Sequence, residues 1–218
     1  MILSRLACNR LGHGYASGMD RTIFLSDRQR EVLVLAARLL RERGLELYAA
    51  REAAALQLHL NRHIDLPKLE AVLQEAQTQL RLFVPNHAEV LFALRQLAAQ
   101  WMMRLAAFTP MLQGGVWLGA ATEHSSIYID LYADSAKDVE IALLNMGIDY
   151  ETPDLGDCAD APLLRCYGHS SVLPRAVPIY LQAHSRQQLR GAWSARLEPG
   201  SDLRLRGDAA ALAAIMQP

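Results

Sequence analysis

The stretch of sequence that decides the fold is GGVWLGAATEHSSIYIDL, residues 114–131. It opens on two glycines, has a third at Gly119, and then passes through a polar turn around His124. From Ile127 to Tyr132 the residues have the composition and alternation of a β-strand. Met111 to Val116 also predicts a short strand, so the segment indicates two strands joined by a glycine-bearing turn.

This arrangement resembles the signature of the DNA polymerase beta-like nucleotidyltransferase superfamily. There a Gly-Ser pair ends a strand, a further Gly follows, and the next strand presents Asp-x-Asp. The resemblance implies that the small residues let a triphosphate approach the backbone, while two aspartates hold two Mg²⁺ ions for phosphoryl transfer. Gly114 matches the first Gly, Gly115 replaces the Ser, and Gly119 matches the later Gly. The two Asp positions fall on Ser126 and Tyr128, so both metal carboxylates are missing.

Asp130 lies two residues beyond these positions, on the same face of the strand. Shifting the alignment by two residues would pair Tyr128 with Asp130, which still leaves one carboxylate. The superfamily's third carboxylate comes from a later strand, and the best candidate here, Ala176–Gln182, has none. Mg²⁺ demands near-octahedral oxygen ligation, so one carboxylate holds two such ions poorly. Asp130 is therefore the one candidate metal ligand in this segment, and Mg²⁺ the one candidate cofactor.

The residues expected to bind a ligand are small or polar and surround the glycine-bearing turn: Gly114, Gly115, Gly119, His124, Ser126 and Tyr128. The glycines would give a ligand close access to the backbone. His124 precedes the key strand, where the resemblance would put a phosphate. The alternative is that His124 only caps or packs the turn.

A narrower resemblance covers roughly residues 27–183. The segment from Gly115 through His124 to Glu140, followed by Leu143–Ile148, is similar to a family of uncharacterised bacterial proteins of comparable length. Those proteins have a helical first half and a nucleotidyltransferase-like second half. This resemblance implies a fold but no settled substrate.

The predicted fold class is α+β. Residues 1–25 form a lead-in segment, 26–110 a helical region, and 111–218 a nucleotidyltransferase-like domain with a small mixed sheet and flanking helices. Helices are expected over 26–44, 45–60, 65–83 and 86–108, with Ser26–Gln29 and Asn86–Glu89 as capping pairs and Pro67 in a first turn. Further elements are helices over 135–146 and 207–216, an acidic loop over 149–162, and strands over 163–168 and 176–183.

The formal net charge of −1 is unevenly distributed. Residues 111–162 carry ten acidic side chains and a single lysine, whereas residues 163–218 carry seven arginines and three acids. This pattern suits a ligand held between two segments, and it suits an ordinary charged surface equally well.

The three cysteines, an odd number without metal-ligand spacing, indicate a reducing compartment, and we expect a cytoplasmic protein. Membrane partners are not expected, because charged and amide residues interrupt the apolar run at 90–108. His59 and His63 are four residues apart but lack a third zinc ligand. Arginines at 186, 190, 196, 204 and 206 have no regular aromatic interleaving, so nucleic acid is disfavoured without being excluded.

Three functions follow from these observations. The preferred one is a nucleotidyltransferase-fold protein that binds a nucleotide or other phosphorylated ligand, with impaired or absent transfer. The first alternative is a non-enzymatic interaction module, including a homo-oligomer formed through the helical half, if the apolar face of the 86–108 helix stays exposed. The second is an active Mg²⁺-dependent enzyme that borrows Asp134, Asp138 or Glu140. The sequence leaves open whether the protein is an enzyme.

Overall fold

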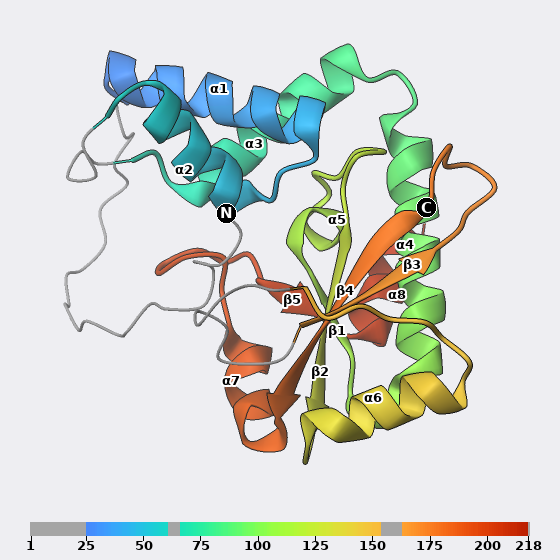
Figure 1. Ribbon diagram of the computed structural model, residues 1–218. Coiled ribbons are helices and arrows are strands. Elements are labelled where there is room, and N and C mark those ends of the chain that lie inside the picture. Colours follow the sequence, from blue (N-terminus) through green and yellow to red (C-terminus); the bar gives the residue numbers. More distant parts are fainter. Residues whose placement is uncertain (1–24, 61–65, 154–162, 218) are drawn as a thin grey trace.

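Helices and strands occupy different parts of the chain. The computed structural model describes residues 25–60, 66–153 and 163–217. Within these ranges the chain is helical up to residue 104, and strands begin only at residue 111. The predicted α+β class is confirmed: a five-stranded mixed sheet is flanked by helices (Figure 1). The predicted lead-in segment falls outside the described residues, apart from residue 25, as does the part of the acidic loop at 154–162.

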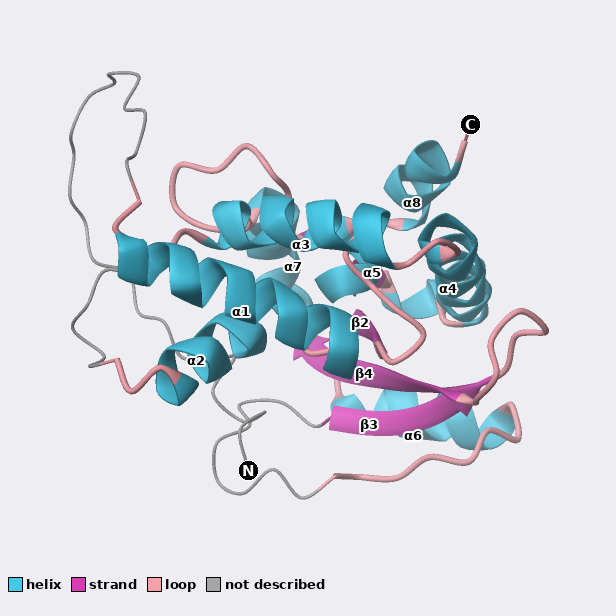
Figure 2. Cartoon of the chain, turned by 90° about the horizontal axis from the view of Figure 1, so that it is seen from above, coloured by secondary structure: helices cyan, strands magenta, loops and turns pink. Residues whose placement is uncertain are grey.

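The first three helices form a bundle with its own apolar core: α1 (Asp27–Arg43), α2 (Leu47–Gln57) and α3 (Leu69–Phe83) (Figures 1 and 2). α1 begins as predicted, because the Ser26 hydroxyl accepts a hydrogen bond from the Gln29 amide and the Gln29 side chain accepts one from the Ser26 amide. It ends at Gly44, whose φ of 63° lies in the left-handed region that glycine tolerates. Leu40 and Leu80 are completely or almost completely buried between these helices.

The beginnings of α3 and α4 differ from the prediction. α3 starts at Leu69, so Pro67 precedes the helix, and its carbonyl accepts a hydrogen bond from Arg51 of α2 at 3.3 Å. α4 (His87–Arg104) starts after Asn86, which makes no side-chain capping bond. Asn86 has φ −95° and ψ 16°, whereas a capping residue normally takes an extended conformation. α4 also ends earlier than predicted, and Ala106–Phe108 form a separate 3₁₀ turn, η2.

The sheet has the strand order β3-β4-β2-β1-β5. Its strands are β1 (Met111–Gln113), β2 (Ile127–Ala133), β3 (Leu163–Gly168), β4 (Val177–Ser185) and β5 (Arg206–Gly207). β2 and β4 run parallel with Tyr128 opposite Tyr180, and the other neighbouring strands are antiparallel. The predicted strands at β2, β3 and β4 are therefore confirmed. The chain crosses from β2 to β4 through α6 (Ala136–Asn145), which begins with the predicted Ser135–Asp138 capping box.

Alternation of side chains gives the sheet two different faces. On β4 every second residue from Val177 to Ala183 is buried, and the buried residues Ile127, Ile129 and Leu131 of β2 lie in the same core cluster. Helices α4, α6 and α8 (Ala209–Met216) contribute to this cluster. The opposite face, called the polar face below, carries the following side chains: Tyr128, Asp130 and Tyr132 from β2, and Tyr180, Gln182 and His184 from β4.

Helix α4 packs against the sheet, although the sequence places it in the helical region. Its buried residues Leu94, Leu97 and Trp101 belong to the same core cluster as the strands. Most of the apolar residues of α4 are thus used in the core, while Phe92 and Met103 remain 45% and 72% exposed. The interaction-module alternative would depend on such exposed residues and stays a prediction.

Three short elements depart from the predicted ones. Residues 114–118 form a helix, α5 (Gly114–Leu118), where the strand was expected to continue. The φ of 75° at Gly114 turns the chain out of the strand. Gly207 belongs to β5, because it pairs with Leu112 of β1, and the closing helix starts two residues later. The Trp117 ring packs so closely over Gly207 that a side chain would collide there. α7 (Leu189–Ser194), preceded by the 3₁₀ turn η4 (Arg186–Gln188), was not predicted.

None of the helices in the described ranges is long and apolar enough to cross a membrane.

Candidate functional site

The glycine-bearing turn lies between β1 and α5, and a carboxylate already occupies it. The Gly115 amide donates a hydrogen bond to Glu46 Oε2 at 2.9 Å. A β-carbon on Gly114 would lie 2.6 Å from the same oxygen, so glycine is needed there both for its φ of 75° and for space. Glu46 is the residue just before α2, which brings the helical bundle to the turn. Sequence reasoning missed this residue, because nothing in the segment around it suggests a partner so far along the chain.

Glu46 is held in a desolvated place. Burial raises the pKa of its carboxyl to about 7, and the hydrogen bond from Gly115 acts in the opposite direction without offsetting burial. The charge of Glu46 also helps to raise the pKa of Tyr128, which places the two side chains in one electrostatic environment. A carboxyl group of the protein itself therefore occupies the place where the resemblance would put a phosphate.

Gly119 has a structural role at the other end of α5. Its φ of 75° ends the helix, and its own amide donates to the Gly115 carbonyl. The neighbouring carbonyls of α5 accept hydrogen bonds from two other helices: Arg95 donates to Val116 and Trp117, and Gln77 donates to Leu118. The turn is thereby fixed between α3 and α4, and Gly119 does not join Gly115 in one binding surface.

Ser126 and Tyr128 occupy the two positions where the resemblance expects aspartates. The Tyr128 hydroxyl hydrogen-bonds with Ser126, and its ring stacks on Tyr180 with the centroids 5.1 Å apart and an interplanar angle of 11°. Burial, followed by the nearby Glu46 and Tyr180, raises the pKa of Tyr128 far above its ordinary value. The phenol therefore stays neutral at any physiological pH. Two stacked aromatic rings stand on adjacent parallel strands where metal-binding carboxylates would be needed.

Asp130 is completely buried on the polar face and is surrounded by protein donors. Gln113 donates to Oδ1 at 2.8 Å, His184 Nε2 lies 3.2 Å from the same oxygen, and Arg206 lies 2.5 Å from Oδ2. The contacts of Arg206 and of His184 Nε2 with Asp130 are close approaches rather than well-aligned hydrogen bonds. Arg206 also donates to Tyr132, whose ring stacks on His184, so these residues form one closed network. Sequence reasoning predicted Asp130 but neither Arg206 nor His184 as its neighbours.

The residues present do not fit the Mg²⁺ pair that the resemblance implies. Among the described residues, no group of three or more His, Cys, Asp or Glu side chains is arranged to hold a metal ion. Asp134 pairs with Arg186 at 3.2 Å, Asp138 accepts the Ser135 amide, and Glu140 accepts the Tyr150 hydroxyl. The carboxylates proposed as substitutes are thus engaged elsewhere, and they do not converge beside Asp130.

The histidine pair and the arginine cluster that the sequence suggested are not arranged as a zinc site or a phosphate-binding site. His59 follows the end of α2 with a φ of 52°, so it is not on a helix face as zinc ligation would require, and His63 lies outside the described residues. Arg206 is buried against Asp130, while Arg196 donates to a nearby backbone carbonyl. The contacts of these two arginines indicate structural roles.

His124 lies apart from the polar face, in the turn before β2. Arg175 lies 2.6 Å from its Nδ1, and Glu123 lies 3.7 Å from its Nε2. Its backbone packs against Gly44, at the end of α1. His124 also lines a cleft together with residues of α1 and of the α3–α4 junction. It is the one predicted ligand-binding residue that borders this cleft.

Comparison with known proteins gives no relative to guide these assignments: no protein-family model, no curated protein and no solved structure matches this chain.

Proposed function

We propose that this chain is a nucleotidyltransferase-like protein that binds a nucleotide or another phosphorylated small molecule and does not transfer nucleotidyl groups. The order of elements supports this proposal: a strand ends at a glycine pair, a short helix follows, and the next strand carries the expected metal positions. A later strand, β4, lies parallel to β2 and beside those positions.

The stacked pair Tyr128–Tyr180 is the observation that best supports the proposed absence of nucleotidyl transfer. Nucleotidyl transfer of the kind the resemblance implies needs two metal ions about 4 Å apart, held by shared carboxylates. Neutral phenols are poor substitutes for those ligands, and the raised pKa of Tyr128 keeps it from ionising. Asp130 forms an ion pair with Arg206, so it offers no free charge to a cation.

Ligand binding without transfer fits the remaining features. Glu46 fills the glycine turn with the protein's own carboxylate, which removes the usual place for a triphosphate. A cleft remains nearby, and its polar lining includes Arg41, His87 and His124 together with the carboxylates of Glu42 and Glu123. Cationic and hydrogen-bonding side chains around a concave surface are suited to a small anion.

The proposal is tested by measuring binding and transfer in the same preparation. Isothermal titration of the full chain with each nucleoside triphosphate, with Mg²⁺ or Mn²⁺, is expected to give heat of binding for at least one of them. A pyrophosphate-release assay under the same conditions is expected to give no signal above a protein-free control. Release of pyrophosphate would refute the absence of transfer, and no heat with any nucleotide would refute ligand binding.

A further inference from the structure

A cleft of about 370 Å³ lies where three distant segments of the chain meet. It is bordered by the end of α1, by the junction of α3 with α4, and by the turn before β2. Gly44 fixes this meeting point, because the backbone of His124 and Ser125 packs directly against it. Small-ligand sites span about 300–1,000 Å³, so this volume suits a single small molecule and not a polymer.

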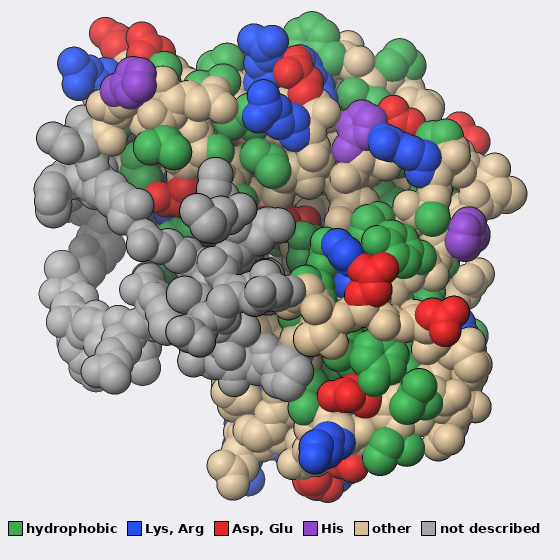
Figure 3. Space-filling model, viewed as in Figure 1, with side chains coloured by type: hydrophobic (Ala, Val, Ile, Leu, Met, Phe, Trp, Pro, Cys, Tyr) green, Lys and Arg blue, Asp and Glu red, His purple; other side chains and the backbone are tan. Residues whose placement is uncertain are grey.

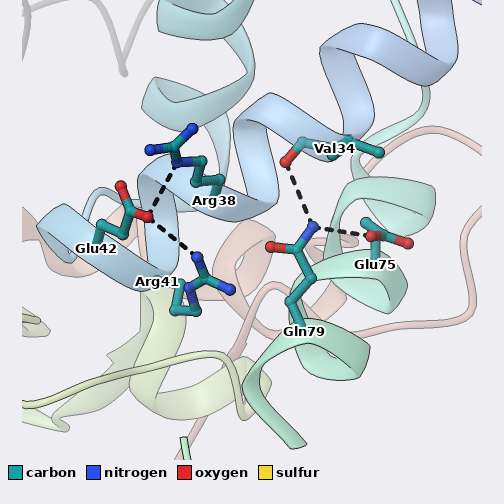
Figure 4. A network of polar contacts seen from close by, with 6 residues as sticks. All are labelled: Val34, Arg38, Arg41, Glu42, Glu75 and Gln79. Carbon is teal, nitrogen blue, oxygen red and sulfur yellow. Dashed lines mark hydrogen bonds and ion pairs between the residues drawn. The ribbon is translucent and has the colours of Figure 1, made fainter. Parts of the chain in front are cut away.

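At the α1 wall of the cleft, Arg41 and Glu42 line the surface, and Arg38 lies just outside it; Glu123 adds a second carboxylate on the opposite side. Arg41 and Arg38 each contact the same oxygen of Glu42 at 3.0 Å (Figure 4). Their hydrogen bonds lower the pKa of Glu42, so this carboxylate is ionised and offsets one of the two guanidinium groups. Of the two arginines, Arg41 lines the cleft, and its guanidinium also lies 4.8 Å from the centre of the Phe83 ring. Figure 3 shows Lys or Arg, Asp or Glu and His side chains close together at the upper right of the described surface.

The opposite wall offers further donors. Arg175 donates to Nδ1 of His124, because a guanidinium has no acceptor. That bond leaves the His124 proton on Nε2, which therefore serves as a donor. The carboxylate of Glu123 lies near this nitrogen at 3.7 Å, beyond a normal hydrogen bond, so the donor is not fully used.

His87, at the start of α4, provides an unsatisfied acceptor. Burial lowers the pKa of its imidazole, which is therefore neutral at pH 7. The ring hydrogen-bonds to the backbone of Ala121, while Nε2 is buried and has no hydrogen-bond partner. A neutral ring that donates through Nδ1 to a carbonyl leaves Nε2 as an acceptor. Because Nε2 is closed to solvent, a ligand in the cleft does not contact it, and His87 serves as part of the cleft wall.

The cleft also has an apolar wall made by Phe83, Val84 and Val90. Phe83 keeps 62% of its surface exposed, which is unusual for a large aromatic side chain. A planar base would recover part of that exposed area by stacking on the ring.

We propose that this cleft binds a nucleoside phosphate, with the phosphate near Arg41 and His124 and the base against Phe83. The inference rests on the proposed function in one respect, namely that the ligand is phosphorylated. It adds the place of binding and the chemical class of the ligand. It assigns binding roles to Arg41 and Phe83, which the sequence did not single out.

The matched pair Arg41→Gln and Arg38→Gln tests the site. Both arginines contact Glu42 at the same distance, but Arg38 does not line the cleft. In isothermal titration with AMP, Arg41→Gln is expected to weaken binding at least about tenfold and Arg38→Gln less than about twofold. Phe83→Leu is expected to weaken AMP binding while leaving the affinity for ribose 5-phosphate unchanged. Unfolding curves of each variant establish that the fold is intact.

The outcomes separate this inference from the proposed function. Nucleotide binding that Arg41→Gln and Phe83→Leu leave unchanged would overturn the cleft site while the proposed function stands. Pyrophosphate release by the wild type, together with lost AMP binding in Arg41→Gln, would overturn the absence of transfer and support the cleft. If Arg38→Gln and Arg41→Gln weaken binding equally, the effect comes from Glu42 and the site is refuted. If the wild type binds neither AMP nor ribose 5-phosphate, the inference is overturned.

Discussion

The carboxylate of Glu46 accepts a hydrogen bond from the backbone amide of Gly115, 69 residues further along the chain, at 2.9 Å. This bond joins the helical bundle to the first turn of α5. A folded protein normally loses stability when a buried carboxyl group ionises, because desolvation penalises the charge. Gly115 supplies only one donor, so Glu46 is a point where stability depends on pH.

Glu46→Gln is expected to remove a specific part of the pH dependence of stability. Burial raises the pKa of Glu46 from 4.5 to about 7. Between these pH values the folded state keeps a proton that the unfolded chain has lost, so the free energy of unfolding falls as pH rises through this window. The fall is at most about 3 kcal/mol and is complete above about pH 7. Glutamine does not ionise, so the stability of the Glu46→Gln variant does not have this dependence on pH.

Urea unfolding of the wild type and of Glu46→Gln at pH 5 and pH 8 measures the effect. The wild type is expected to lose stability relative to the variant between the two pH values, whatever other groups contribute to both proteins. A difference between the two proteins that is the same at pH 5 and pH 8 would show that Glu46 ionises normally.

The local elements follow closely from the sequence, because their signals are local. Ser26 with Gln29, and Ser135 with Asp138, form the capping boxes that their spacing predicts. The strand at β2 was predicted because its apolar residues alternate. Errors occurred where the decisive interaction is non-local: Gly207 belongs to a strand rather than a helix because it pairs with Leu112 of β1.

The candidate site was predictable only in part, for the same reason. The replacement of the metal positions by Ser126 and Tyr128 can be read directly from the residues. The carboxyl group that occupies the glycine turn belongs to Glu46, just before α2, and no spacing rule connects Glu46 with Gly115. The partners of Asp130 come from β1, β4 and β5, so its contacts with Gln113, His184 and Arg206 became evident only from the strand order.

Asp130→Asn is expected to destabilise the protein by about 3 kcal/mol. A surface aspartate would cost no more than about 0.5 kcal/mol. Asp130, however, is completely buried, and its removal leaves the guanidinium of Arg206 without a counter-charge in a place where its side chain is only 17% exposed. Urea unfolding at pH 7 measures the loss.

Asp134→Asn is the control for this effect, because it makes the same chemical change just after β2. Asp134 also pairs with an arginine, but 75% of its side chain is exposed, and such pairs contribute little. We expect a loss below about 0.5 kcal/mol. Equal losses in the two variants would show that the Asp130 network does not stabilise the fold.

Ser126→Asp combined with Tyr128→Asp is expected to create Mg²⁺ binding if the backbone has nucleotidyltransferase geometry. The two side chains already hydrogen-bond to each other, and Glu46 lies close enough to influence Tyr128 electrostatically. Two new carboxylates beside a third would repel one another until a cation binds, so Mg²⁺ should raise the melting temperature. The neutral pair Ser126→Asn with Tyr128→Asn should show no such rise. A folded aspartate variant that ignores Mg²⁺ would refute the alignment of residues 114–131.

Gly44→Ala is expected to destabilise the protein more strongly than Gly147→Ala, although the two glycines have φ values of 63° and 64°. Each substitution incurs the cost of a left-handed alanine, about 1 kcal/mol. At Gly44 the new methyl would also collide with the His124 carbonyl and lie 2.7 Å from the Ser125 amide nitrogen, whereas at Gly147 it would meet nothing within 4 Å. The clash adds about 2 kcal/mol, since the packed backbone must move.

The clash would also push apart two walls of the cleft, so the affinity for AMP should fall in Gly44→Ala and stay unchanged in Gly147→Ala. Urea unfolding and titration with AMP measure the two effects, and equal losses of stability would show that the end of α1 does not pack against the His124 turn.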